Sequence, residues 1–478
     1  MRFIFLGAGG SGMSGLCRFL HDLRKRDVIG IDTGYGPPLD MLIQAGVTIH
    51  TTFGSVPILP TDIVIYTDIP AIKQTPEYQA SIARPSSRTN VPLTLSFHHC
   101  VAEISKRFST LAIAGSNGKT SSTTMAIHAM KQLLPNQRAW GMVGSMVTER
   151  GNTGFVANPT AHDDITTIID YLFRNKGIAP YELVGKWRCV IEADEFNRHC
   201  LLYNPSITII TTIDHDHSDC FPTLESYHDV FRRLTATTKR AVITDPHLLS
   251  ILTPTDTPII TSSSIQDCRQ AQFFSPLHHL RGPHNIANAS MVMTAIKTIN
   301  PGLSDTIIWE TIAHTPPLAR RTEIIGQLDN LTIISDYAHH PPAIKPTLQG
   351  IRDHYPHLPL TIIWEPHQAR RMLDGRDTWR EVFASEDLII VPPYTARESI
   401  DEYINHPLFT QYQRQSFDEC AQALAHHCHA QRCASFETLW NRLQEKKSDG
   451  PRVIVLMTAG VLDPWMRRKL KTHHNTLA

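Results

Sequence analysis

A glycine-rich stretch that carries a lysine and a hydroxyl, Leu111–Thr120, has the composition of a phosphate-binding loop. Its first residues form an apolar segment typical of a short strand, and a helix is expected from Ser121. The turn between them consists of Gly115, Ser116, Asn117, Gly118, Lys119 and Thr120. Glycines let backbone N–H groups converge on phosphate oxygens, the lysine adds a positive charge, and the threonine hydroxyl can bind Mg²⁺. A strand-turn-helix without a ligand remains an alternative, because Ile113 stands where the longer GxxxxGK[ST] pattern has its first glycine.

Two later apolar segments end in side chains that suit a metal-bound nucleotide. The segment Trp187–Glu192 predicts a buried strand that ends in Glu192, and Thr208–Ile213 predicts a second strand, followed by the string Asp214-His-Asp-His217. Because parallel strands present their carboxyl ends at one edge of a sheet, we expect Glu192 and His217 near the phosphate loop. Carboxylate and hydroxyl oxygens suit Mg²⁺, and a histidine would suit a second metal site. The acidic string could instead cap the helix expected at Leu224–Leu234, or belong to a zinc hydrolase, which would leave Lys119 without a role.

A second glycine turn lies near the N-terminus. The strand Arg2–Leu6 is followed by a GxGxxG turn that contains Gly9, Gly10, Ser11 and Gly12, and then by a helix at Met13–Asp22. A further strand, Val28–Ile31, ends in Asp32, twenty residues after Gly12. Such a turn lets a diphosphate approach the helix N-terminus, and the acid can meet a ribose hydroxyl. The pattern fits a nicotinamide dinucleotide, another nucleotide diphosphate, or a Rossmann-like half without a ligand.

Polar residues also recur at the expected strand ends of the last third of the chain. The strand Leu331–Ser335 ends in Asp336, with His339 and His340 just beyond it, and the strand Leu360–Trp364 precedes Arg371. Arg321 lies shortly before the first of these strands. The carboxyl edge of a parallel sheet is where α/β proteins place their ligands. Each of these residues alone could equally lie in a solvated loop.

Asn285 and Asn288 open the helix expected at Ala287–Ile299. Their amides could hydrogen-bond a purine edge, or Asn285 could simply cap the helix. At 478 residues the chain is too long for one core. Strands that alternate with helices predict an α/β protein. We expect three domains: Rossmann-like residues 1–107, a P-loop domain with a parallel sheet at 108–317, and Rossmann-like residues 318–478.

Composition excludes several classes of protein. The 45 basic and 45 acidic residues balance, which argues against a nucleic-acid-binding or polybasic membrane surface. Nine scattered cysteines without a CxxC pair indicate reduced thiols in a cytoplasmic protein rather than zinc fingers or a secreted scaffold. No segment approaches the roughly 18 apolar residues of a membrane span, and the apolar run Phe3–Leu6 is too short for a signal sequence. We therefore expect an enzyme without membrane insertion; its oligomeric state does not follow from the sequence.

The motifs together resemble one family. Six short strings occur in a fixed order across three α/β regions: GSNGKT, EADE, DHDHSD, RGPHNIAN, ARR and SDYAHHP. This order is similar to that of the Mur ligase family of peptidoglycan synthesis. The resemblance covers nearly the whole chain and is strongest to members that add L-alanine. It implies that the first domain binds a UDP-sugar, the second ATP and the third the incoming amino acid, with the third closing over the others. The first glycine turn would then bind the UDP diphosphate.

The same resemblance implies individual roles. Lys119 would hold the ATP phosphates, Thr120 a first Mg²⁺, and Glu192 and His217 a second. Asn285 and Asn288 would meet adenine, Arg321 the phosphates and Asp336 the ribose, while His339, His340 and Arg371 would lie near the amino-acid carboxylate. The implied reaction phosphorylates the lactyl carboxylate of UDP-N-acetylmuramate, and an amine then attacks the acyl phosphate.

Several positions depart from the family pattern. Ser116 and Asn117 replace the Thr and His of the usual GTHGKT loop, Thr212 replaces an Asn, and Gln368 and Ala369 replace an Arg and a Tyr. Glu365-Pro366 is closer to the related ligase that recycles murein tripeptide, which is the alternative function. From other classes, an NAD(P)-dependent oxidoreductase that uses the first glycine turn, or a non-catalytic nucleotide-binding regulator, would also explain part of the pattern.

Overall fold

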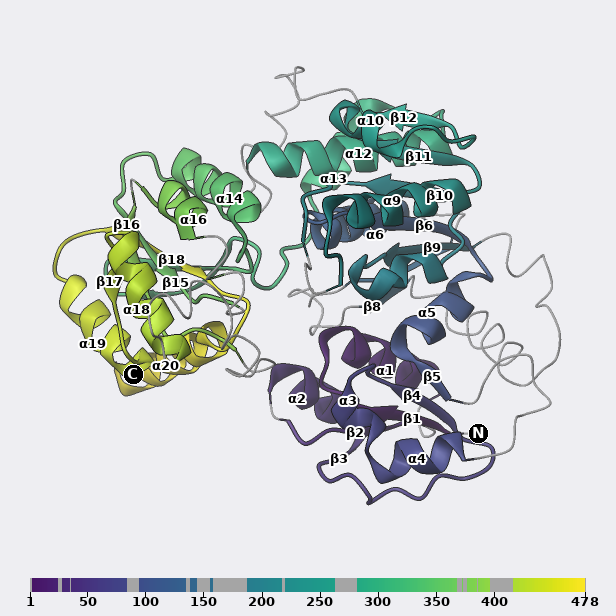
Figure 1. Ribbon diagram of the computed structural model, residues 1–478, viewed down its shortest axis with the longest axis horizontal. Coiled ribbons are helices and arrows are strands. Elements are labelled where there is room, and N and C mark those ends of the chain that lie inside the picture. The colour runs from purple at the N-terminus through teal and green to yellow at the C-terminus, as the bar shows by residue number, and fades with distance from the viewer. Residues whose placement is uncertain are drawn as a thin grey trace. The chain divides into compact units, whose positions relative to one another are not determined.

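A computed structural model of the chain describes residues 2–24, 28–34, 36–83, 94–134, 138–143, 155–157, 187–216, 220–262, 282–367, 372, 376–384, 386–395 and 416–477. Within these ranges the strands form three separate sheets, each accompanied by helices (Figure 1). Most strand pairs are parallel and alternate with helices along the chain. The predicted α/β class with three domains is confirmed.

The N-terminal sheet is built from short apolar strands around a central, fully buried β1. Its strands are parallel in the order β3-β2-β1-β4-β5, with bounds β1 (Phe3–Leu6), β2 (Val28–Ile31), β3 (Thr48–His50), β4 (Ile63–Tyr66) and β5 (Thr94–Ser96). Its helices are α1 (Ser11–Arg24), α2 (Pro37–Gln44), α3 (Pro70–Lys73), α4 (Pro76–Ile82) and α5 (Phe97–Ser105). The chain crosses from one side of β1 to the other between β3 and β4, so the glycine turn after β1 lies at the switch point of this sheet.

The central sheet has the order β12-β11-β10-β6-β9-β7-β8, and all its pairs are parallel except β7 with β8. The strands are β6 (Ser109–Ala114), β7 (Arg138–Met142), β8 (Phe155–Ala157), β9 (Trp187–Glu192), β10 (Ile207–Ile210), β11 (Ala241–Thr244) and β12 (Ile259–Thr261). The helical segments are α6 (Lys119–Leu133), η3 (Phe196–Leu202), α9 (Leu224–Thr237), η4 (Pro246–Leu248), α10 (Leu249–Leu252), α12 (Pro283–Ile299) and α13 (Asp305–Ala313). Because β6 lies between β9 and β10, the ends of both neighbours flank the loop that follows β6.

The C-terminal sheet has the order β13-β14-β18-β15-β16-β17, with β13 antiparallel to β14 and the remaining pairs parallel. The strands are β13 (Glu323–Leu328), β14 (Leu331–Asp336), β15 (Leu360–Trp364), β16 (Asp387–Ile390), β17 (Gln431–Arg432) and β18 (Arg452–Met457). The helices are α14 (Pro341–His354), α16 (Arg376–Val382), α18 (Phe417–His427), α19 (Phe436–Lys446) and α20 (Leu462–Leu477). Insertion of β18 between β14 and β15 brings three strand ends together at one edge.

The described chain divides into two compact units. One consists of residues 1–275 and 285–318 and holds the N-terminal and central sheets; the other consists of residues 276–284 and 319–478 and holds the C-terminal sheet. Within the first unit the core is continuous, since Phe19 of α1 stacks on Trp140 of β7 with ring centroids 5.9 Å apart. The expected boundary at residue 107, between the first two domains, stays a prediction, as do the other domain limits.

Two predicted elements differ in length from the structure. Strand β10 ends at Ile210 rather than Ile213, because the next residues turn toward the phosphate loop, where the Thr212 carbonyl accepts a hydrogen bond from Ser116 N at 3.0 Å. Helix α12 begins at Pro283 rather than Ala287, since a proline is well suited to the first turn of a helix.

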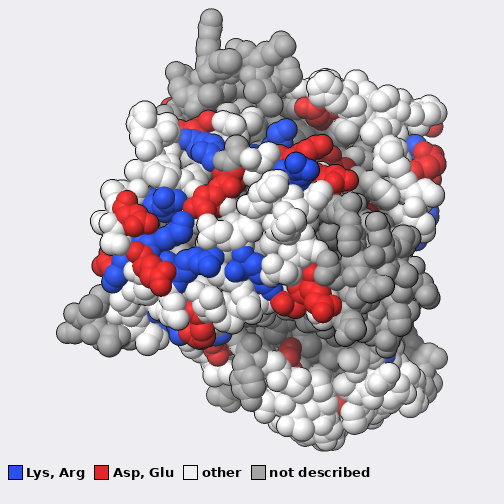
Figure 2. Space-filling model, turned by 60° about the vertical axis from the view of Figure 1, so that its left-hand side comes forward, with Lys and Arg blue, Asp and Glu red and all other residues white. Residues whose placement is uncertain are grey.

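Surface charge follows the balanced composition. On the face drawn in Figure 2, acidic side chains lie beside basic ones. Among the helices that the structure describes, none is both long enough and apolar enough to cross a bilayer.

Candidate active site

The phosphate loop joins β6 to α6 through two glycines with positive φ. Gly115 has φ +133° and Gly118 has φ +83°, conformations that side chains rarely adopt. A Cβ at Gly115 would lie 2.9 Å from Thr212 N, and one at Gly118 would lie 2.6 Å from Asn288 Oδ1. The loop therefore needs glycine at both positions, as predicted, and α6 starts directly behind it at Lys119.

Lys119 is the cation of this loop. Its Nζ donates to the Gly115 carbonyl at 2.6 Å and to Glu195 Oε2 at 2.7 Å, and it lies 3.8 Å from Asp194 Oδ1. Burial disfavours the charge, but Glu195 and Asp194 outweigh burial and raise the pKa of Lys119 above its ordinary value. Lys119 is thus a fixed positive charge at the N-terminus of a helix, the environment that an anionic phosphate needs.

A hydroxyl and a carboxylate meet at the start of α6. Thr120 Oγ1 donates to Glu192 Oε1 at 3.0 Å, and Glu192 is the last residue of β9, the neighbour of β6. The structure therefore brings together two predicted metal ligands from separate parts of the chain. Hydroxyl and carboxylate oxygens are the ligands that Mg²⁺ prefers, so the pair fits that ion. The third predicted ligand, His217, lies outside the described residues.

Three of the positions that depart from the family pattern contact one another or a shared neighbour. Ser116 Oγ lies 2.9 Å from Thr212 Oγ1, and Asn117 N donates to the same hydroxyl at 2.9 Å. Ser116 Oγ also accepts from Asp214 N at 2.7 Å, and Asn117 Nδ2 donates to Asp214 Oδ2 at 3.1 Å. The three substituted positions Ser116, Asn117 and Thr212 thus form one hydrogen-bonded set that ties the phosphate loop to the segment after β10.

Sequence reasoning missed Glu195, which holds Lys119. Its side chain is fully buried, and the Tyr227 hydroxyl of α9 donates to Glu195 Oε1 at 3.3 Å. Burial, followed by the proximity of Glu195, raises the pKa of Tyr227, so the phenol remains the donor. The EADE string contained the signal, but the sequence alone does not show which of its carboxylates points at the lysine.

The two asparagines of α12 are both buried, Asn285 at 6% and Asn288 at 4% exposure. Asn288 lies directly against Gly118 of the phosphate loop, within the same compact unit. The predicted contact of these residues with adenine stays a prediction.

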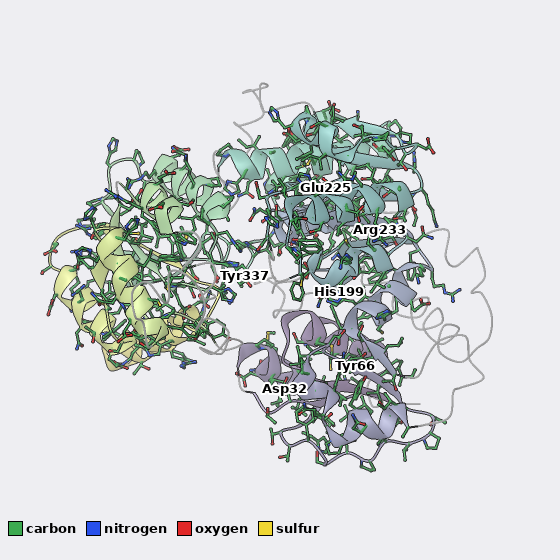
Figure 3. All side chains as sticks on the ribbon, in the orientation of Figure 1. Asp32, Tyr66, His199, Glu225, Arg233 and Tyr337 are labelled. Carbon is green, nitrogen blue, oxygen red and sulfur yellow. The ribbon has the colours of Figure 1, made fainter. Side chains whose placement is uncertain are left out.

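In the N-terminal domain Asp32 braces the glycine turn. Its carboxylate accepts a hydrogen bond from Gly9 N at 2.7 Å and another from Gly34 N at 2.8 Å. Figure 3 labels Asp32 at the end of β2, beside the turn. The roles of Gly9, Gly10, Ser11, Gly12 and Asp32 in substrate binding stay predictions. The structure adds that Asp32 orders the turn itself.

In the second unit, predicted site residues gather at the carboxyl edge of the C-terminal sheet. Asp336 accepts from Thr322 N at 2.7 Å and Ala338 N at 2.8 Å, and Arg321 lies over the Tyr337 ring at 5.2 Å. Figure 3 marks Tyr337 at this edge. The rings of His339 and His340 lie 4.5 Å apart. Arg371, with Gln368 and Ala369, lies outside the described residues.

Sequence reasoning named Glu365 only as part of a motif, yet it links the strand ends of this edge. It is fully buried, and it accepts hydrogen bonds from the Thr458 hydroxyl and from Val461 N at 3.2 Å. Burial raises the pKa of Glu365, while the hydroxyl and the backbone amides oppose that shift. His367, two residues further, lies 5.0 Å from the His339 ring.

Comparison with known proteins identifies the class. Residues 113–296 match the family model of the Mur ligase middle domain, which spans the phosphate loop, Glu192, Glu195 and most of α12. Residues 113–296 of this chain are therefore similar to the Mur ligase middle domain, and the resemblance to the Mur ligase family is confirmed.

Among individual relatives, the UDP-N-acetylmuramate–L-alanine ligase of Lactobacillus gasseri is 27% identical over 423 residues, covering 83% of this chain and 86% of that enzyme. The crystal structure of the UDP-N-acetylmuramate–alanine ligase MurC from Thermotoga maritima matches with a TM-score of 0.69 at 19% identity, covering both chains completely. A murein peptide ligase from Psychrobacter arcticus matches with a TM-score of 0.61 at 18% identity, covering 99% of this chain and 98% of that one. These structural matches show the shared fold.

Proposed function

We propose that this protein is an ATP-dependent, ADP-forming ligase that joins an amino acid, L-alanine first, to the carboxylate of UDP-N-acetylmuramate in peptidoglycan synthesis. The observation that carries the proposal is the 3.0 Å contact of Thr120 with Glu192 beside the buried Lys119–Glu195 pair, within a Mur ligase middle domain. The named relatives support the choice of substrates. The site of action is the cytoplasm.

The residues of the phosphate loop have distinct tasks in this reaction. The backbone amides of the loop and the N-terminus of α6 hold the phosphates, and Lys119 stabilises the charge that spreads over the transferring phosphoryl group. Glu195 and Tyr227 fix the lysine in place. Thr120 would hold a first Mg²⁺, and Glu192 with His217 would hold a second; bound Mg²⁺ would neutralise phosphate charge.

The chemistry has two stages. The substrate carboxylate attacks the γ-phosphorus of ATP, releases ADP and becomes an acyl phosphate. The amine then attacks the acyl carbon to give a tetrahedral intermediate, and phosphate leaves. Exclusion of water protects the acyl phosphate from hydrolysis. The second unit supplies the remaining contacts. The nucleotide is assigned to Asp336 and Arg321, and the incoming amino acid is assigned to His339, His340 and Arg371.

A second candidate, ligation of murein tripeptide, is favoured by one observation. The chain carries Glu365-Pro366 after β15, closer to the tripeptide-recycling ligase, and a murein peptide ligase shares the fold. The two functions use the same acyl phosphate chemistry and differ in the amine accepted.

A panel of amines separates these functions. Purified protein with ATP, Mg²⁺ and UDP-N-acetylmuramate is tested with L-alanine, other amino acids and the tripeptide, and ADP release is measured. We expect ADP release only when both the UDP-sugar and one amine are present, fastest with L-alanine. A preference for the tripeptide would select the second function. ATP hydrolysis independent of all amines, or tight NAD(P)H binding without ATP binding, would refute both.

A further inference from the structure

Two histidines and an aspartate converge beside the phosphate loop without a task in the proposed reaction. His98 lies on α5, Asp194 just after β9, and His199 on η3. Each offers one ligand atom, and these atoms lie within 4.8 Å of one another. In the part of the chain that the structure describes, no other group of three or more His, Cys, Asp or Glu side chains does so. Among the described residues, the spacing of these three side chains therefore marks them as a candidate metal site.

The local backbone is shaped to bring His199 back toward Asp194. Asn197 and Arg198 have φ of +49° and +59°, a left-handed conformation that costs energy in residues other than glycine. The resulting turn is closed by Cys200 N, which donates to the Asp194 carbonyl at 2.7 Å. On the other side, the Ser96 hydroxyl caps α5 by accepting from His99 N at 3.3 Å, which sets the start of the helix that carries His98. Figure 3 labels His199 on this segment.

The two imidazoles stack on each other, and each has a buried nitrogen without a hydrogen bond. Their rings stack with centroids 3.7 Å apart and 13° between planes. Burial, reinforced by the neighbouring His199, lowers the pKa of His98 to about 4, and burial also lowers the pKa of His199. Among the described residues, Nδ1 of each ring is buried and makes no hydrogen bond. Each of the two stacked rings thus keeps a polar nitrogen buried without a hydrogen bond, which is costly unless a ligand takes it.

The surroundings carry the complementary charge. The carboxylates of Asp194 and Asp68 both act electrostatically on the two rings and favour positive charge there. Lys119 lies on the other side of Asp194, 3.8 Å from Oδ1. A cation placed between the rings and Asp194 would therefore be favoured by these two carboxylates.

We propose that His98, Asp194 and His199 bind a transition-metal dication, with Zn²⁺ as the metal that this ligand set suits best. Two imidazoles and one carboxylate are a ligand set for zinc and its neighbours, whereas Mg²⁺ prefers oxygen alone. The site is separate from the oxygen ligands Thr120 and Glu192, and it does not depend on the proposed function. Zinc–nitrogen bonds are roughly 2.0–2.1 Å long, so the ligand atoms must move closer to one another than they are now. The two rings would then tilt out of their parallel stack, so that one nitrogen of each ring points at the metal.

The site would couple the N-terminal and central domains of the first unit. His98 belongs to the helix that follows β5, while Asp194 and His199 follow β9 of the central sheet. A metal bound to all three would fasten these elements together. It would also draw Asp194 away from Lys119, leaving Glu195 as the main partner of the lysine. We therefore expect metal binding to raise the temperature of unfolding.

The test is a metal titration of the full chain. Protein is kept in excess Mg²⁺ and ADP, so that the nucleotide site is occupied, and is titrated with Zn²⁺ against a competing chelator, and separately with Co²⁺. We expect one equivalent of metal, with affinity at least tenfold weaker in His98→Gln and in His199→Gln. His99→Gln is the matched control, because His99 is an exposed neighbour on the same helix, and it should bind like the unaltered chain. Unfolding temperature is followed with and without Zn²⁺.

Equal binding by all variants, or no binding by the unaltered chain, would overturn the proposal. The Co²⁺ spectrum of the unaltered chain gives a reading that holds even where a variant fails to fold. Two imidazoles and a carboxylate predict visible absorption of four-coordinate Co²⁺ without thiolate charge transfer. A thiolate charge-transfer band would place the metal on cysteine and contradict the assignment.

Discussion

Lys119 is the residue on which the proposed phosphoryl transfer depends, and the structure shows what keeps it in place. The side chain of Lys119 is 14% exposed, and that of its partner Glu195 is fully buried. Such a pair is costly to break from one side, because the remaining charge is left in the interior without a partner. Loss of Lys119 is therefore expected to lower both the activity and the free energy of unfolding. Substitution of both partners can separate these two effects.

At this scale we predict that Lys119→Met abolishes ADP formation, by roughly 10²–10³-fold or more, and destabilises the chain by about 3–5 kcal/mol. Lys119→Met combined with Glu195→Gln should recover most of the stability and none of the activity, because the stranded carboxylate is gone while the phosphate-binding charge is still missing. Urea unfolding and ADP release measure the two effects. The matched control is Lys106→Met, whose ion pair with Glu103 lies at the surface. Recovery of activity in the double variant would contradict the assigned role.

Individual site residues could be predicted from the sequence where a strand end fixed their position. Thr120 and Glu192 follow neighbouring strands, and the structure places them 3.0 Å apart. Glu195 and Asp194 could not be assigned, because they lie in the turn beyond β9, where backbone conformation rather than periodicity decides which carboxylate faces the lysine. The left-handed Asn197 and Arg198 carry no sequence signal of the kind that glycine gives.

At the scale of elements, the phosphate loop is defined by its fit between α6 and α12. Gly118 caps α6 with φ +83°, and Asn288 of α12 fills the space where a Cβ would project. The loop and α12 therefore constrain each other, although nearly 170 residues separate them in the sequence.

We predict that Gly118→Ala destabilises the chain by more than the roughly 1–2 kcal/mol that a left-handed backbone alone costs. The additional loss of stability comes from the contact between the new Cβ and Asn288. The double variant Gly118→Ala with Asn288→Ala should therefore recover this additional loss. Gly450→Ala is the control, because Gly450 has φ +94° with nothing within 4 Å of the added Cβ. Denaturant unfolding of these three variants measures the difference. Equal losses for Gly118→Ala and Gly450→Ala would show that the contact with α12 is unimportant.

A second element-scale prediction concerns the opposite end of the C-terminal sheet, where Asp387 opens β16. Its carboxylate accepts from Thr361 Oγ1 at 2.7 Å and Lys446 Nζ at 2.9 Å. Burial alone would raise the pKa of Asp387, but Lys446 and Thr361 outweigh it, and the pKa is lowered. The carboxylate therefore adds stability above its unfolded pKa of about 3.9, and this contribution is lost as the pH falls through the folded value.

Asp387→Asn should accordingly cost about 1–2 kcal/mol near neutral pH, a loss that shrinks below about pH 4 as the carboxylate of the unaltered chain becomes protonated. Urea unfolding at a series of pH values, followed by circular dichroism, measures it. Asp353→Asn serves for comparison, because Asp353 is exposed on α14. A loss that is the same at all pH values would mean that the charge of Asp387 plays no part.

At the scale of the whole molecule, three sheets of alternating strands and helices could be predicted because their strands are short, strongly apolar and separated by glycine or proline turns. The sheet orders could not be predicted from the sequence, since insertion of β9 beside β6 and of β18 beside β15 depends on long-range pairing. The early end of β10 has the same origin, because contacts of Thr211 and Thr212 with the phosphate loop replace strand pairing there.

In the proposed reaction, the carboxylate of the substrate is activated by phosphorylation before an amine attacks it. Oxygen-18 tests this claim directly. The chain is incubated with ATP, Mg²⁺, L-alanine and UDP-N-acetylmuramate labelled in the lactyl carboxylate, and the released phosphate is analysed by mass spectrometry. We predict that each released phosphate carries one oxygen from the carboxylate. Phosphate without label, formed by attack of water on ATP, would contradict it.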